Sequence, residues 1–157
     1  MSIVVENSTV LSALTEKFAE VFGDTKEVEY FFSPGRINLI GEHTDYNGGY
    51  VFPASITIGT TGLARLREDK KVKLYSENFP KLGVIEFDLD EVEKKDGELW
   101  SNYVKGMIVM LKGAGYEIDK GFELLIKGEI PTASGLSSSA SLELLGGVVL
   151  DDLFTLM

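Results

Sequence analysis

The sequence predicts a single α+β domain, and the prediction rests on two periodicities and on the lack of a linker. In three segments, apolar residues recur every three or four positions, which is the spacing of an amphipathic helix. Between these segments, β-branched and aromatic residues dominate stretches that Gly and Pro interrupt, as is typical of strands. The chain has 157 residues, enough to bury an apolar core, and no internal repeat. We therefore expect residues 1–157 to form one layered domain.

The first predicted helix covers residues 9–22. Ser8 or Thr9 can cap its start, and Gly23 can adopt the left-handed conformation that ends it. Strands are predicted next, and Pro34 with Gly35 is expected to break the first of them. The predicted strands of the first half are residues 28–33, 50–67, 71–76 and 83–89.

The second half begins after a charged, solvated connection over residues 90–98. The elements predicted there are a helix from Trp100 to Gly113 or Gly115, a strand over 122–128, a loop over 129–135 and a helix from Leu136 to Phe154. The last helix has serines in its first turn, and the stretch "VVLDDLFTLM", residues 148–157, at its end contains apolar residues that would normally have neighbours to pack against. We expect these residues to leave an exposed apolar face.

Composition argues against several classes of function. The chain has 25 acidic and 15 basic residues, and its formal net charge of −10 opposes a nucleic-acid backbone. Cysteine is absent, which excludes disulfides, thiolate catalysis and cysteine-ligated metals. No basic leader segment and no apolar run near 20 residues is present. We expect a cytoplasmic protein that binds neither nucleic acid nor membrane.

The stretch "GEIPTASGLSSSASLELL", residues 128–145, places small residues directly before the third predicted helix. A helix start offers about four unpaired N–H groups and a partial positive charge, and small side chains allow an anion to approach them. This composition fits a phosphate cradle. A serine-capped helix without a ligand explains it equally well, and a flexible linker explains it less well. The small residues are Ala133, Ser134, Gly135, Ser137, Ser138, Ser139 and Ala140.

The cradle differs from a Walker A sequence. No lysine lies between Lys127 and the end of the chain, so a metal, the helix dipole or a residue elsewhere would have to neutralise phosphate charge.

A second polar group lies in "FFSPGRINLIGEHTDYNGGYVFPAS", residues 31–55. Glu42, His43 and Asp45 gather before an Asn-Gly-Gly turn, and Arg36 precedes them. Convergent donors and acceptors of this kind are typical of sites that bind a small polyol such as a sugar. Taken singly, the acids fit a solvated turn, the histidine fits a satisfied core position, and the arginine fits a surface ion pair.

Together, these two stretches resemble the galactokinases of the GHMP small-molecule kinase family. "PGRINLIGEHTDYNGGYVFP" resembles the galactokinase signature, and its "GEHTDYN" portion distinguishes galactokinases from other members. "PTASGLSSSASLELL" resembles the phosphate-binding motif, and "KLYSENF" and "WSNYVKG" are similar to intervening segments. The resemblance implies a GHMP kinase amino-terminal domain: an α+β fold with a mixed or antiparallel sheet and helices packed on one face, here incomplete.

The resemblance also implies ATP-dependent phosphorylation of the anomeric hydroxyl of D-galactose, with Mg²⁺. By matching position, Arg36 would stabilise charge in the transition state. Galactose would be contacted by Glu42, His43, Thr44 and Asp45. The nucleotide phosphates would be held by Ala133, Ser134, Gly135, Leu136, Ser137, Ser138 and Ser139. Ser139 would also ligate Mg²⁺, Ser76 would lie by the nucleotide, and Trp100 would flank the adenine.

The chain departs from the family pattern because galactokinases continue well beyond Met157. The catalytic aspartate, the acidic second magnesium ligand and a third glycine-rich motif belong to that later region. We expect residues 1–157 to be the amino-terminal part of such an enzyme, weakly active or inactive alone. A non-catalytic sensor of galactose and nucleotide, or a kinase for a related sugar such as N-acetylgalactosamine, stays open. The sequence does not indicate an oligomeric state.

Overall fold

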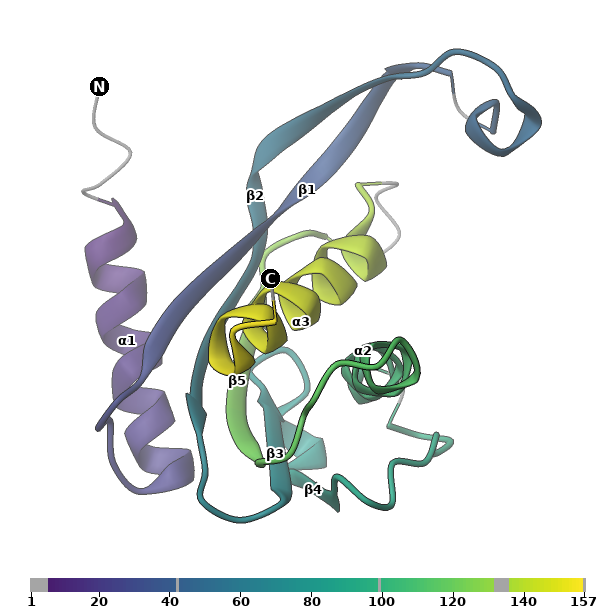
Figure 1. Cartoon of the computed structure of the whole chain (residues 1–157). Coiled ribbons are helices and arrows are strands. Elements are labelled where there is room, and N and C mark those ends of the chain that lie inside the picture. The colour runs from purple at the N-terminus through teal and green to yellow at the C-terminus, as the bar shows by residue number, and fades with distance from the viewer. Residues whose placement is uncertain (1–5, 42, 99, 132–135, 157) are drawn as a thin grey trace.

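The computed structural model describes residues 6–41, 43–98, 100–131 and 136–156, apart from the side chains of residues 6–9 and 45. This part of the chain forms helices packed on a sheet (Figure 1). In chain order the elements are α1 (Glu6–Phe22), β1 (Glu29–Ile40), the 3-10 turn η1 (Asp45–Asn47), β2 (Phe52–Leu66), β3 (Lys71–Ser76), η2 (Pro80–Leu82), β4 (Ile85–Asp88), α2 (Ser101–Gly113), β5 (Phe122–Gly128) and α3 (Ser138–Phe154).

The sheet has the strand order β1-β2-β5-β3-β4. β3 and β5 run parallel, whereas the other neighbours are antiparallel. The mixed sheet of an α+β fold is therefore confirmed. β5 lies between β2 and β3, so strands from both halves of the chain meet at the centre of the sheet.

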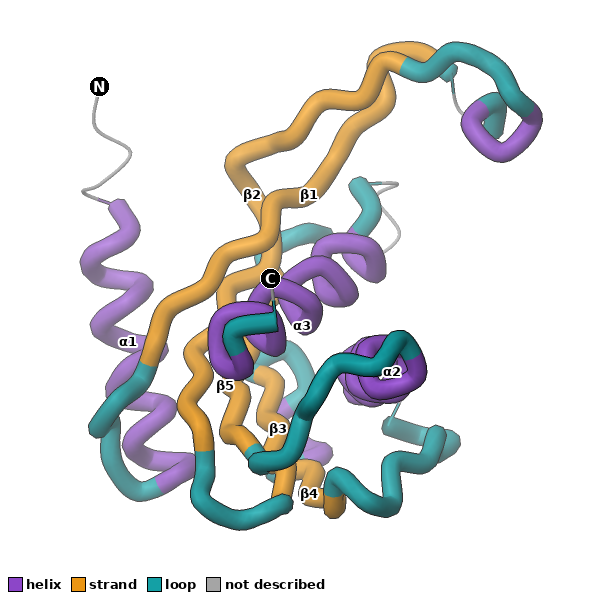
Figure 2. The backbone as a smooth tube through the Cα atoms, viewed as in Figure 1, coloured by secondary structure: helices purple, strands orange, loops and turns teal. Residues whose placement is uncertain are grey.

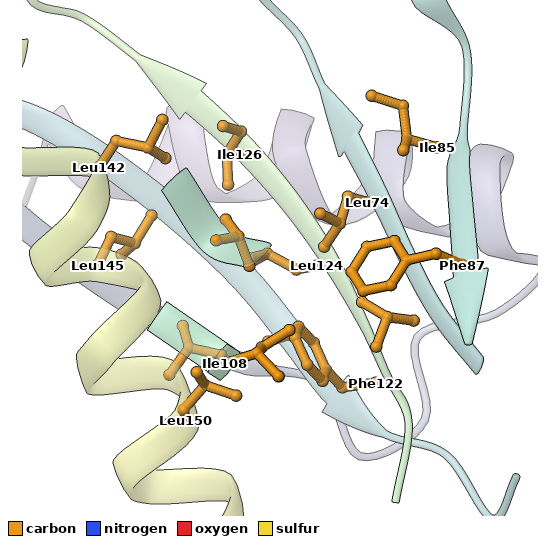
Figure 3. Packing of buried hydrophobic residues seen from close by; sticks show 14 of the residues in the cluster. Leu74, Ile85, Phe87, Ile108, Phe122, Leu124, Ile126, Leu142, Leu145 and Leu150 are labelled. Carbon is orange, nitrogen blue, oxygen red and sulfur yellow. The ribbon is translucent and has the colours of Figure 1, made fainter. Parts of the chain in front are cut away.

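The larger apolar core lies between the sheet and the pair α2 and α3 (Figure 3). Leu124 and Ile126 of β5 point toward Ile108 of α2 and Leu142 and Leu145 of α3. Each fully buried side chain of this size contributes roughly 1.5–3 kcal/mol through removal of apolar surface from water.

Helix α1 lies on the opposite face, which corrects the expectation that the helices share one face. Leu14 and Phe18 of α1 form a second cluster with Leu63, Tyr75 and Leu125. Side chains alternate between the faces of a strand, so Leu125 points away from its neighbours Leu124 and Ile126. The sheet thus has apolar residues on both faces. Helices α2 and α3 bury those on one face, and α1 buries those on the other.

Pro34 and Gly35 do not break β1, contrary to the prediction. The strand continues to Ile40, with register shifts after Pro34 and after Asn38. β1 is an edge strand, where a proline without an N–H is tolerated, and the shifts absorb the irregularity. Beyond Pro34 the paired ends of β1 and β2 form a ribbon that carries η1 away from the helices (Figure 2).

The other predicted elements are largely confirmed. β3 and β5 have the predicted bounds, and the helices agree to within three residues at each end. The exposed apolar face expected over residues 148–157 is found, among the described residues, only at Val148, which is 49% exposed. The other apolar side chains of this stretch are buried, as are Val149 and Leu150, or pack against the core, as do Leu153, Phe154 and Leu156. Over the ranges that the structure covers, no helix is both long and apolar enough to cross a membrane.

Candidate functional site

A cavity of about 250 Å³ lies at the start of α3. Its walls include four residues that the sequence nominated: Ser76 at the end of β3, Trp100 before α2, and Ser138 and Ser139 in the first turn of α3. Other walls are apolar, among them Ile126 of β5. The strand order explains this convergence. β5, the strand that leads to α3, runs parallel to β3 and beside it, so the ends of the two strands lie next to each other.

The first turn of α3 does not use its serines as side-chain caps. Ser137 occupies the cap position with a left-handed backbone, at φ 60°, and its hydroxyl makes no capping hydrogen bond. Ser138 and Ser139 are exposed. The capped-helix explanation therefore does not account for these hydroxyls. Ala133, Ser134 and Gly135, predicted for the same cradle, lie outside the described residues.

A buried hydroxyl anchors this turn to the sheet. Ser141 is 1% exposed; its Oγ donates to the carbonyl oxygen of Ser33 at 2.8 Å, and the Thr60 hydroxyl, 2.9 Å away, can donate to it in turn. These bonds join α3 to β1 and β2 directly beneath the cavity, where Thr60 forms part of the wall. A satisfied buried hydroxyl pair of this kind fixes helix position at little net cost.

Asn78 forms a wall of the cavity that sequence reasoning missed. Its Nδ2 donates to the carbonyl oxygen of Gly128 at 2.8 Å, and its Oδ1 accepts the Gly128 N–H at 2.7 Å. The Asn78 N–H also donates to Oγ of Ser76 at 3.3 Å. These bonds fasten the segment after β3 to the end of β5. In the sequence, Asn78 lies in the segment "SENF". This local pattern does not indicate that Asn78 bonds Gly128, which is 50 residues away.

Trp100 closes another side of the cavity. It is 5% exposed, and its indole Nε1 finds no acceptor among the residues that the structure describes. Lys105, one turn further along α2, is 3% exposed and bonds Glu98 through Nζ and Oε2 at 2.8 Å. The pair links the segment before Trp100 to the body of α2. It thereby holds the cavity wall in place.

Arg36 adjoins the cradle through its backbone. Its N–H donates to the carbonyl oxygen of Leu136 at 3.3 Å. The Arg36 side chain is exposed and makes no ion pair with any described residue. The alternative that Arg36 forms a surface ion pair is therefore not supported by the described residues.

Three of the predicted sugar-binding residues, His43, Thr44 and Asp45, lie in the turn at the far end of the β1–β2 ribbon (Figure 1). His43 is exposed with φ 60°, and its Nδ1 is 2.7 Å from the hydroxyl of Tyr46, so it is not a core residue. The Thr44 hydroxyl donates its one proton to the carbonyl oxygen of Gly41 at 2.6 Å, and its oxygen lies 3.1 Å from the carbonyl oxygen of Tyr50. Thr44 therefore builds the turn itself.

The remaining sugar-binding predictions cannot be located by side chain. Glu42 lies outside the described residues, and the structure places only the backbone of Asp45, in η1. None of the described cavities joins this turn to Ser138 and Ser139. Four of the described residues predicted for the nucleotide thus meet at one cavity: Ser76, Trp100, Ser138 and Ser139. Leu136, Ser137, His43 and Thr44 are not among its lining residues.

The electrostatics of the cavity suit an anion held by neutral donors. No charged side chain is among its lining residues, and the start of the 17-residue helix α3 supplies a partial positive charge. For a magnesium ion, the lining offers the hydroxyl of Ser139 but no carboxylate. Within the described ranges, no cluster of three His, Cys, Asp or Glu side chains could hold a metal. Mg²⁺ commonly retains waters and phosphate oxygens, so a single hydroxyl ligand is compatible with its chemistry.

Comparison with known proteins finds two family matches. The galactokinase galactose-binding signature matches residues 16–66, and the amino-terminal domain of GHMP kinases matches residues 102–157. A galactokinase of Lactococcus lactis subsp. lactis is 99% identical over 99% of this chain and 39% of its own length. A galactokinase of Clostridium acetobutylicum is 56% identical over 94% of this chain and 38% of its own length. The chain spans about two fifths of the length of these relatives.

Solved structures give the same picture. The crystal structure of Lactococcus lactis galactokinase complexed with galactose matches with a TM-score of 0.91 at 99% identity, over 94% of this chain and 38% of that chain. Methanococcus jannaschii mevalonate kinase matches with a TM-score of 0.69 at 19% identity, over 84% of this chain and 42% of that chain. At that identity, the second likeness concerns the fold alone.

Proposed function

Because this chain belongs to the galactokinases of the GHMP kinase family, we propose that it forms the nucleotide-binding side of an enzyme that phosphorylates galactose. The predicted family and fold class are confirmed by these matches, whereas the activity is our proposal. The observation that carries it is the cavity at the start of α3, which Ser76, Trp100, Ser138 and Ser139 all line. The N-cap residue of this helix makes no side-chain capping hydrogen bond. We propose that residues 1–157 act as part of an amino-terminal domain.

We assign the phosphates of ATP to the first turn of α3. The exposed hydroxyl of Ser138 supplies a donor, and the start of α3 supplies unpaired N–H groups. Ser137 and Leu136 belong to the same turn. We assign Ala133, Ser134 and Gly135 to this cradle from the sequence. Mg²⁺, when bound, would be held by the Ser139 hydroxyl and the phosphates, and it would neutralise developing charge.

The adenine is assigned to the apolar end of the cavity, beside Trp100. Trp100, Tyr103 and Ile126 line that end, and a flat base can stack against aromatic rings there. The indole N–H of Trp100 is buried and has no acceptor among the described residues. Ser76, whose Oγ already accepts the N–H of Asn78, lies at the same wall.

Arg36 is assigned to charge stabilisation during transfer. The anomeric hydroxyl oxygen of galactose attacks the γ-phosphorus, the bond from that phosphorus to the bridging β-phosphate oxygen breaks, and the hydroxyl proton passes to a base. A guanidinium beside the transferring group stabilises the charge that develops on its oxygens. The base is not assigned to any described residue, because no carboxylate lines the cavity.

Galactose is assigned to Glu42, His43, Thr44 and Asp45. Support comes from the galactose-binding signature over residues 16–66 and from the galactose in the Lactococcus structure. Thr44 donates its hydroxyl proton within the turn, so it would contact a sugar through its oxygen lone pairs. For phosphate transfer, a galactose bound at the β1–β2 turn would have to lie next to the start of α3. Residues other than those described would complete the site between them.

The first test uses the single tryptophan of the chain, Trp100, as a fluorescent probe. We expect titration with ADP or ATP to change the Trp100 emission saturably, and calorimetry to detect galactose independently. We expect turnover of ATP and galactose by the 157-residue chain to be far below kinase rates. Lack of nucleotide binding at millimolar concentration would overturn the assignment of the cavity. Normal turnover would overturn the expectation of weak activity.

A sensor without catalysis remains the second candidate, since the cavity lining lacks a carboxylate that could act as base. A full-length protein containing this segment separates the two possibilities: binding of both ligands without phosphate transfer identifies a sensor. N-acetylgalactosamine, offered in place of galactose, tests the choice of sugar in the same assay. The cytoplasmic location stays a prediction from the sequence.

A further inference from the structure

Tyr103 connects two walls of the cavity through a single hydrogen bond. Ser139 Oγ lies 3.1 Å from the hydroxyl oxygen of Tyr103, and the hydrogen bond between them joins the first turn of α3 to the first turn of α2. Tyr103 itself lines the cavity, and its partly buried ring packs against the main apolar core. The sequence analysis did not nominate this residue.

This bond restricts the orientation of the Ser139 hydroxyl. A serine hydroxyl has one proton to donate and two lone pairs that accept. Whichever of the two hydroxyls donates, at least one lone pair of the Ser139 oxygen remains available to a cation. Near a helix start, a serine hydroxyl can instead turn toward local backbone groups. The Tyr103 hydroxyl therefore selects one orientation of the Ser139 side chain.

Tyr103 is suited to this task because its own helix turn is firmly held. The side chain of the preceding residue, Asn102, makes two hydrogen bonds with the backbone of Lys95. Its Nδ2 donates to the carbonyl oxygen at 2.9 Å, and its Oδ1 accepts the N–H at 3.2 Å. On the other side, Lys105 bonds Glu98 at 2.8 Å. A group that orients another must itself be held by packing and hydrogen bonds, and these contacts provide that support.

We propose that Tyr103 is a positioning residue that orients the Ser139 hydroxyl so that its oxygen faces the cation accompanying the nucleotide phosphates. This inference rests on the proposed function of the cavity. It assigns Tyr103 a role that depends on the cation, whereas a purely structural bond between α2 and α3 would act equally with and without one.

The experiment compares Tyr103→Phe, Ser139→Ala and the double variant in the 157-residue chain, with Tyr116→Phe as control. Tyr116 is a partly exposed tyrosine beside the outer groove between α2 and α3. ADP affinity is measured by Trp100 emission, with Mg²⁺ and in EDTA. Loss of one hydrogen bond predicts that Tyr103→Phe weakens ADP binding about fivefold in Mg²⁺. In EDTA we expect less than about a twofold change, because the bond acts through the cation.

The double variant isolates the coupling. If Tyr103 acts through Ser139, the double variant binds ADP with Mg²⁺ as weakly as Ser139→Ala alone, and Tyr116→Phe binds like the parent chain. Additive losses, an equal loss in EDTA, or unchanged binding by Tyr103→Phe would overturn the inference while leaving the nucleotide cavity intact. Melting curves verify that each variant is folded. If the parent chain binds no ADP under either condition, the proposed function fails, and the inference fails with it.

Discussion

The backbone N–H of Arg36 donates a hydrogen bond to the carbonyl oxygen of Leu136 at 3.3 Å. This bond joins the edge strand β1 to the residues that lead into α3, and so it brings together two segments that are far apart in the sequence. Gly35 makes the approach possible. A Cβ at this position would lie 3.1 Å from the Leu136 oxygen and 3.0 Å from Cδ1 of Ile130.

The first prediction concerns this close approach. Gly35→Ala forces the neighbouring atoms to move by a few tenths of an ångström. We expect it to destabilise the chain by about 1–2 kcal/mol, as overpacked sites do, and to weaken ADP binding by displacing the cradle. Urea unfolding and Trp100 titration measure the two effects.

Gly106→Ala is the matched control for Gly35. Gly106 lies within α2, and a Cβ there meets nothing within 4 Å. We expect a gain of about 1 kcal/mol from helix propensity and unchanged ADP binding. Equal behaviour of the two alanine variants would show that the approach of β1 to the cradle is not tight.

The second prediction concerns the Arg36 side chain in a complete enzyme that contains this segment. We expect Arg36→Ala to lower turnover by two to three decades, about 2–4 kcal/mol of barrier, while galactose affinity changes far less. The variant should fold normally, because the side chain is exposed and only the backbone contacts Leu136. Steady-state kinetics with a melting curve tests this, and equal losses in turnover and affinity would refute the assigned role.

The third prediction concerns the buried ion pair behind Trp100. Removing one partner leaves a buried charge uncompensated, so we expect Glu98→Ala to cost about 3 kcal/mol. This value is at the low end for buried pairs because Glu98 is partly open to solvent. Lys105→Met removes the buried charge and keeps the apolar stem, and we expect it to stay within about 1 kcal/mol of the parent. Urea denaturation ranks the two variants.

The exposed pair of Lys71 and Glu86, whose charged atoms are 2.6 Å apart, provides the comparison for that experiment. Glu86→Ala should lower the stability far less than Glu98→Ala does, because water screens a surface pair. A cost for Glu98→Ala no larger than that for Glu86→Ala would mean that the buried pair does not hold the wall of the cavity.

The fourth prediction concerns pH. A hydrogen bond with the Asp152 carboxyl, together with partial burial and the charge of Asp152, raises the pKa of Glu29 above its ordinary value of 4.5. The folded state therefore binds this proton more tightly than the unfolded state. The resulting stabilisation is fully present below pH 4.5 and is lost as the pH rises through the raised pKa.

Glu29→Gln cannot ionise, so it removes the repulsion between the two carboxylates near neutral pH. We expect this variant to be more stable than the parent at pH 7 and close to it at pH 4, as measured by thermal unfolding. The exposed residue Glu117, changed to Gln, serves as control and should show no such trend. A constant difference between Glu29→Gln and the parent across this range would contradict the prediction.

Local patterns in the sequence were sufficient to predict most of the secondary structure. The strand over residues 122–128 and the helix ending at Phe154 follow from side-chain type and period, which act between near neighbours. The continuation of β1 through Pro34 was missed, because a proline is excluded from a central strand but tolerated at an edge. Which strand lies at the edge depends on pairing between distant segments.

The sequence by itself determined the α+β class, the family and the small residues that begin α3, because these depend on residue type and spacing. Only the tertiary structure decided that Ser76, Trp100 and Ser139 line one cavity, that Asn78 and Tyr103 belong to it, and that α1 lies on the opposite face of the sheet. The physical reason is the position of β5 between β2 and β3. Pairing between strands far apart in the chain creates that neighbourhood, and no local pattern encodes it.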